Sequence, residues 1–178
     1  MTNYSIYLRD GLLFSYLEYV GEDYESDMKA VDDDRDTQEW WKLTDPMQAP
    51  LPVHPQTEWW ANMDLLYTYN ASINTAGSSS RRIAYVAASE EDPRVLANEA
   101  HGSGGSLPLS VAAGIAVNKF SVFAGYGRVC LYAEITGRSQ RGDTASPGRI
   151  LSLDDAKWDI QRHLKSDWQE MREVFFAE

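Results

Sequence analysis

The chain has 178 residues, of which 43% are hydrophobic and 12% are aromatic, and it carries a formal net charge of −11 with a sequence pI near 4.7. This composition supplies enough apolar side chains for a substantial core in one large or two small domains, and it argues against disorder. The acidic field repels phosphate backbones and anionic lipid heads, so nucleic acid and membrane surfaces are poor partners.

A single cysteine, Cys130, excludes an internal disulfide framework, and its neighbours favour a small apolar residue in a strand. Because there is no apolar run of membrane-helix length and no signal-like start, we expect a soluble, cytoplasmic protein. The three histidines, His54, His101 and His163, are scattered and offer no metal-ligand spacing. We therefore expect no metal site.

The first predicted element is a β-hairpin. Residues 4–8 alternate between two faces, Asp10 and Gly11 follow, and residues 12–19 form a second strand-like run. An Asp-Gly pair between two such runs is a strong signal for a two-residue turn. From Glu22 onwards, apolar residues recur at helical spacing, which predicts an amphipathic helix.

A second short helix carries two adjacent tryptophans, Trp40 and Trp41, with Asp36 as its predicted N-cap and Pro46 as its stop. Neighbouring residues on a helix point roughly 100° apart, so the two rings cannot face the same layer. Either both rings are packing residues, one in the core and one at an interface, or one forms an aromatic platform for a ligand.

A proline-broken connection over residues 48–57 leads into a strand that ends at Tyr69, and its alternation places Leu65 on the same face as Tyr67. The next stretch is small and polar and is typical of a linker. The predicted organisation is a first half at residues 1–70, a linker at 71–80 and a divergent second half at 81–178.

The second half begins with a predicted strand over residues 82–88 and a helix that starts after Asp92 and ends at His101. A hairpin around Tyr126 and Gly127 then repeats the opening hairpin, and a helix is predicted from about Leu153 to Met171. In this repeat Tyr4 falls on Phe120, Ser5 on Ser121, Tyr7 on Phe123, Tyr16 on Tyr132, and Glu18 on Glu134.

A second match relates the run from Asp167 to the run from Trp59, in the same order along the chain. Two ordered matches predict an internal duplication, in which the first copy lacks an opening strand and helix and the second lacks the tryptophan helix. The restored unit is strand, helix, strand, strand, helix, strand, which is the ferredoxin-like α+β order with helices on one face of an antiparallel sheet. Two such sheets would pack their bare faces together as a pseudo-dimer.

Three segments resemble the L-rhamnose mutarotase family: Asn3-Tyr4-Ser5-Ile6-Tyr7, the TQEWWKLTDP string over residues 37–46, and a terminal W-x-x-M-x-x-x-Y/F element. The resemblance covers nearly all of residues 2–69 and is weaker in the second half. It implies ferredoxin-like subunits that pair as a dimeric α+β barrel, here in duplicated and rearranged form. It also implies a cofactor-free isomerase that interconverts anomers of L-rhamnose or a related sugar.

The resemblance further implies that Tyr4, Trp40 and Trp41 contact the sugar, and His101 lies about where the family has its proton donor. Anomer exchange needs an acid and a base of moderate pKa, and an indole plane suits the apolar C–H face of a sugar ring. As an alternative, His101 is an ordinary histidine at a helix C-terminus before a glycine stop.

Two other functions stay open at this stage. The barrel can serve as an isomerase, cyclase or monooxygenase on a hydrophobic small molecule in secondary metabolism, which requires a roomy apolar cavity. It can also be a non-catalytic small-molecule-binding domain. In each case the expected partner is a small molecule, either a sugar or a hydrophobic metabolite, and the chain is a monomeric pseudo-dimer or a homodimer.

Overall fold

The computed structural model describes residues 2–52, 59–71, 80–100, 110–111, 115–137, 151–152 and 162–177. Its main feature is one antiparallel sheet of seven strands in the order β2-β1-β9-β4-β7-β6-β3. The strands are β1 (Thr2–Arg9), β2 (Leu12–Glu18), β3 (Asp64–Asn70), β4 (Ser80–Ala88), β6 (Ile115–Gly125), β7 (Arg128–Gly137) and β9 (Gln169–Ala177). A separate pair joins β5 (Ser110–Val111) to β8 (Leu151–Ser152).

The helices are α1 (Tyr24–Asp33), α2 (Arg35–Thr44), the 3₁₀ turn η1 (Asp45–Met47) and α3 (Pro93–Ala100). Strands therefore dominate the described structure, and the fold is consistent with the expected ferredoxin-like α+β class. No helix in the described ranges is long and apolar enough to cross a membrane.

Both predicted hairpins are present, and both have the same turn. Asp10 and Gly11 have φ angles of 48° and 78°, and Tyr126 and Gly127 have φ angles of 52° and 74°. Positive φ at both central residues defines the two-residue type I′ turn, whose twist matches that of the flanking strands. The two predicted hairpins are therefore confirmed.

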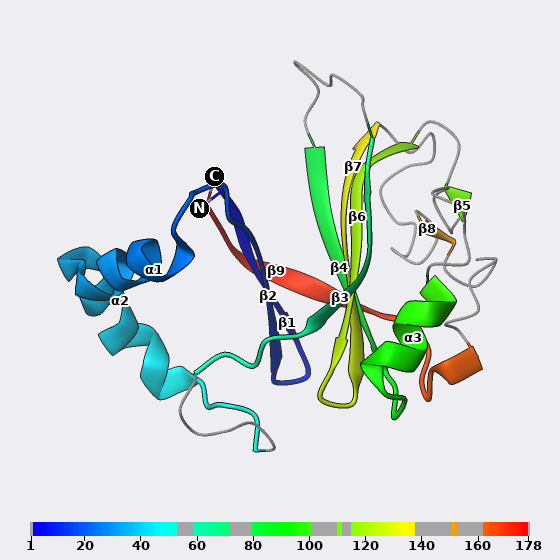
Figure 1. Cartoon of the computed structure of the whole chain (residues 1–178), viewed down its shortest axis with the longest axis horizontal. Coiled ribbons are helices and arrows are strands. Elements are labelled where there is room, and N and C mark those ends of the chain that lie inside the picture. The colour runs from blue at the N-terminus through cyan, green and yellow to red at the C-terminus, as the bar shows by residue number, and fades with distance from the viewer. Residues whose placement is uncertain are drawn as a thin grey trace.

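The strands of the two expected halves join in one sheet rather than in two. The C-terminal strand β9 pairs with β1 of the first hairpin on one side and with β4 on the other. The strand β3, which precedes the predicted linker, pairs with β6 of the second hairpin. Each half thus places one strand against the other half's hairpin, as Figure 1 shows for β9 between the two hairpins. The internal duplication and the division into halves stay predictions.

The sheet curls, so that the side chains on its inner face meet. Phe14 and Tyr16 of β2 pack against Phe123 of β6, with ring centroids 5.9 and 6.0 Å apart. The inner core consists of Tyr7, Phe14, Tyr16, Ala84, Val86, Cys130, Tyr132 and Met171. The outer core consists of Leu66, Ile83, Tyr85, Leu96, Val117, Phe120, Val122, Ala124, Val129, Leu131, Ala133 and Ile135.

The helices cover the outer face unevenly. Helix α3 packs on β3 and β6 and buries Leu96, which is 1% exposed. Helices α1 and α2 contain no buried residue, and they lie beside the first hairpin on the side away from the second one (Figure 1). Leu43 and Met47 are 71% and 78% exposed, so this pair of helices is held to the sheet by few apolar contacts.

Three details of the predicted elements are wrong. The N-cap of the tryptophan helix is Asp34, whose side chain accepts from the Thr37 amide, so the helix begins before Asp36. In β3 a register shift between Leu65 and Tyr67 leaves Leu65 55% exposed and buries the next residue instead. The late helix cannot extend to Met171, because β9 begins at Gln169 and its main chain pairs with β4.

Substitution of the turn glycine should destabilise the second hairpin. Gly127 has a φ of 74°, where a Cβ costs roughly 1–2 kcal/mol, so Gly127→Ala should lower the free energy of unfolding by about that amount. Gly125→Ala, two residues earlier, is the control, since its Cβ would meet only Met63 at an ordinary 3.6 Å. Urea denaturation compares the two variants, and equal losses would contradict the assigned turn.

Candidate functional site

Two of the predicted sugar-contacting residues lie around one phenylalanine on the outer face of the sheet. Tyr4 lies on the face of β1 opposite to the inner residue Tyr7. Its ring centroid is 5.5 Å from that of Phe175 on β9, and the Trp40 ring on α2 is 5.7 Å from the same phenylalanine. The structure therefore brings Tyr4 and Trp40 to one aromatic cluster. Trp41 is half-buried on the same helix.

Burial raises the pKa of Tyr4, and a hydrogen bond from Ser15 offsets part of this rise. The phenol therefore stays protonated at neutral pH and can donate a hydrogen bond. His101, the candidate proton donor, and His54 lie outside the described residues. Ala100, the last residue of α3, belongs to a helix that packs on β3 and β6.

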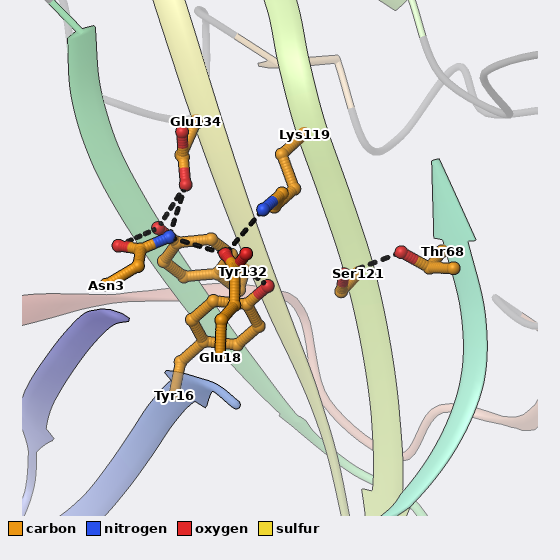
Figure 2. A network of polar contacts seen from close by, with 8 residues as sticks. All are labelled: Asn3, Tyr16, Glu18, Thr68, Lys119, Ser121, Tyr132 and Glu134. Carbon is orange, nitrogen blue, oxygen red and sulfur yellow. Dashed lines mark hydrogen bonds and ion pairs between the residues drawn. The ribbon is translucent and has the colours of Figure 1, made fainter. Parts of the chain in front are cut away.

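A second group of polar side chains, from β1, β2, β6 and β7, surrounds the inner-core residues Tyr16 and Tyr132 (Figure 2). The Asn3 amide donates to Glu18 Oε1 at 2.7 Å and to Glu134 Oε1 at 2.5 Å. Its two N–H protons are therefore shared between two carboxylates that come from different hairpins. Asn3 has a φ of 55° at a register shift between β1 and β2, which is a left-handed conformation that asparagine tolerates better than most residues.

Glu18 is held ionised by three donors. Burial alone would raise its pKa, but hydrogen bonds from Lys119, Asn3 and Tyr16 leave the pKa below its ordinary value. All three donors approach Oε1, and the Lys119 contact is a short ion pair between β6 and β2. A partly buried, charge-assisted contact of this kind is stronger than one between neutral groups.

Two stacked tyrosines form the floor below the carboxylates. The rings of Tyr16 and Tyr132 lie 3.7 Å apart between centroids and 8° from parallel. The Tyr16 hydroxyl is 3.1 Å from Glu18 Oε1, and the Tyr132 hydroxyl is 2.8 Å from Glu134 Oε1. Burial is the larger of two causes that raise the pKa of each phenol, and the adjacent carboxylate is the second. Both tyrosines therefore remain hydrogen-bond donors throughout the physiological range.

This polar group opens into a recess of about 330 Å³. Arg82 contributes a second cation: its guanidinium lies 3.2 Å from the centroid of the Phe176 ring, and its Nε is 2.9 Å from Glu173. The recess is lined by Thr2, Asn3, Glu18, Ser80, Arg82, Lys119, Glu134 and Phe176. We find no group of histidine, cysteine, aspartate and glutamate suited to a metal ion in the described part of the chain.

Sequence reasoning identified one part of this recess and missed the rest. The repeat aligned Tyr16 with Tyr132 and Glu18 with Glu134, but it gave no sign that these pairs meet in space. Asn3 belongs to the Asn3–Tyr7 motif but had no predicted role, Arg82 lies in no motif, and the pairing of β1 and β4 with β9 brings both residues to the recess. The matching glutamates of the two hairpins were therefore visible in the repeat, but their proximity depends on the curl of the sheet.

A comparison with known families finds a match in the N-terminal part of the chain. Residues 1–69 match the model of the L-rhamnose mutarotase family. This segment contains Tyr4, Trp40 and Trp41, so the resemblance of the sequence motifs to this family is confirmed there. No curated protein and no solved structure matches the chain. The mutarotase segment ends at β3, the strand that pairs with the second hairpin.

In this segment the charge state of Glu18 should depend on Lys119. Because folding lowers the pKa of Glu18, its contribution to stability is full above the ordinary value of 4.5 and is lost as the pH falls through the lowered pKa. Lys119→Met should raise the pKa of Glu18 and weaken this acid dependence. Carbon-detected NMR titration of the Glu18 carboxylate measures this pKa. Lys42→Met, which removes the cation of an exposed ion pair with Glu39, is the control. An unchanged Glu18 pKa would refute the role of Lys119.

Proposed function

We propose that the chain is a cofactor-free sugar mutarotase-like isomerase that interconverts anomers of L-rhamnose or a related sugar by general acid/base catalysis. The match of residues 1–69 to the L-rhamnose mutarotase family carries this proposal. The convergence of Tyr4 and Trp40 on Phe175 supports it, because these residues present an aromatic surface and a phenol on one face of the sheet.

The chemistry requires two proton transfers. An acid protonates the ring oxygen while a base removes the proton of the anomeric hydroxyl, so that the ring C–O bond breaks and a carbonyl forms. Reclosure on the other face of the carbonyl, with both transfers reversed, gives the second anomer. In the proposal His101 is the acid, the Tyr4 phenol holds a sugar hydroxyl and the indole of Trp40 or Trp41 covers the C–H face.

The packing of the inner face favours this reading over a barrel that acts on a hydrophobic molecule. That function needs a roomy apolar cavity between the sheet faces, whereas Tyr7, Phe14, Tyr16, Phe123 and Tyr132 contact one another there. The proposed partner is therefore a sugar. The cytoplasmic location and the oligomeric state stay predictions.

Exchange NMR on L-rhamnose tests the proposal. The protein should accelerate magnetisation transfer between the two anomers. This acceleration should fall roughly tenfold in Trp40→Ala, because the contact of the ring with the sugar is lost. It should fall roughly 100-fold or more in His101→Ala, because the proton donor is lost. Trp59→Ala is the matched control, because Trp59 is exposed and lies outside the aromatic cluster. If the unmodified protein did not accelerate exchange, the proposal would fail. Sugar binding without acceleration would instead identify a non-catalytic binding domain.

A further inference from the structure

The aromatic cluster of the proposed sugar site draws on both ends of the chain. Tyr4 and Trp40 lie in residues 1–69, which match the mutarotase family, whereas Phe175 lies on the C-terminal strand β9, outside that match. Antiparallel pairing sets Phe175 opposite Ile6 of β1, and Tyr4 lies two residues before Ile6 on the same face of the strand. The family match therefore supplies the groups proposed to contact the sugar, but not the ring on which they converge.

A matching ring pair occurs in the second hairpin. The predicted repeat aligns Tyr4 with Phe120 and Tyr67 with Phe175. The Phe120 and Tyr67 rings meet edge to face, with centroids 6.1 Å apart and planes 66° apart. The Tyr4 and Phe175 rings repeat this geometry at 5.5 Å and 64°. Each hairpin thus contacts a ring from the closing strand of the other half, because β3 pairs with β6 and β9 pairs with β1.

The two ring pairs differ in what covers them. Phe120 carries no hydroxyl, is fully buried and shares one core cluster with Leu96 of α3, the helix that packs on β3 and β6. Tyr4 and Phe175 are half-buried, and the helix beside them, α2, brings the half-buried indole of Trp40. Among the described residues, the pair at Tyr4 thus offers a ligand a phenol, an indole and an accessible surface, whereas the pair at Phe120 is closed.

Phe175 contacts both groups and so fixes one relative to the other. The Tyr4 hydroxyl is hydrogen-bonded by Ser15 on the neighbouring strand β2, and Phe175 packs against the Tyr4 ring. The Trp40 ring lies against the same phenylalanine, tilted by 38°. Since α2 has no buried residue, this contact helps to attach the helix to the sheet. Removal of the Phe175 ring would leave both contact groups present but free to shift relative to each other.

We propose that Phe175 is a positioning residue of the sugar site, which holds the Tyr4 phenol and the Trp40 indole so that both contact one sugar ring. The inference rests on the proposed function for the identity of the ligand. Both contacts are made to the bound sugar before any bond breaks, so their loss weakens the ground state and the transition state alike. A change at Phe175 should therefore raise KM and leave kcat nearly unchanged, unlike the loss of an acid or a base.

Substitution of Phe175 tests this role through sugar affinity. Phe175→Leu keeps an apolar side chain but removes the ring. A titration of the full chain with L-rhamnose, followed by the tryptophan indole N–H signals, should therefore show an affinity about tenfold lower. Phe175→Tyr keeps the ring and should retain the affinity. Phe176→Leu is the matched control and should also retain it, because Phe176 is the next residue of β9 but lines the inner recess, where Arg82 covers its ring.

Exchange NMR then separates binding from chemistry. In Phe175→Leu the KM for L-rhamnose should rise about tenfold at an unchanged kcat, whereas His101→Ala should lower kcat. Phe175→Met, a second variant without a ring, should reproduce the change in KM. Amide spectra establish that each variant is folded.

The positioning role is overturned if the unmodified chain does not bind L-rhamnose, or if both ringless variants bind it as tightly as the unmodified chain. An equal loss of affinity in Phe176→Leu also overturns it. Binding that weakens only at Phe175, without any anomer exchange, supports the positioning role and removes the mutarotase reaction. Exchange with an unchanged KM in both ringless variants removes the positioning role and leaves the reaction.

Discussion

Main-chain pairing of β9 on both of its edges is the constraint on which the rest of the structure depends. One edge of β9 pairs with β1 and the other with β4, so this strand joins the first hairpin to the second half of the chain. The pairing of β3 with β6 makes the reciprocal connection. Together the two pairings join all seven strands in one sheet, and the curl of this sheet brings β2 close to β6 and β7.

The curl gives the two faces of the first hairpin different chemistry. Successive residues of a strand point to opposite faces, so Tyr4 reaches the aromatic cluster under α2, while Ser5 and Tyr7 join the inner core. Asn3, two residues before Ser5, shares the inward orientation of Ser5, and its amide reaches the inner carboxylates. One strand thereby serves an aromatic outer surface and a charged inner recess.

Local features of the fold were predictable from the sequence, and long-range pairing was not. The first hairpin was predictable from Asp10-Gly11, because this pair favours a two-residue turn, and the second followed from its repeat around Tyr126-Gly127. The exposure of Leu65 was missed, since a bulge in β3 depends on its partner strand. Tyr4 and Trp40 were named from motifs and do lie together, whereas the contact of Glu18 with Lys119 required the curl of the sheet.

The position of β9 also governs the order in which the protein can fold. The β1–β2 hairpin is local and can form early. The other edge of β1 pairs only with β9, whose residues 169–177 lie at the far end of the described chain. Closing so long a loop is slow relative to local pairing, and topologies with many such contacts fold slowly. Until then β1 presents unpaired amides and carbonyls, so during synthesis the nascent chain carries an open strand edge that invites misassembly.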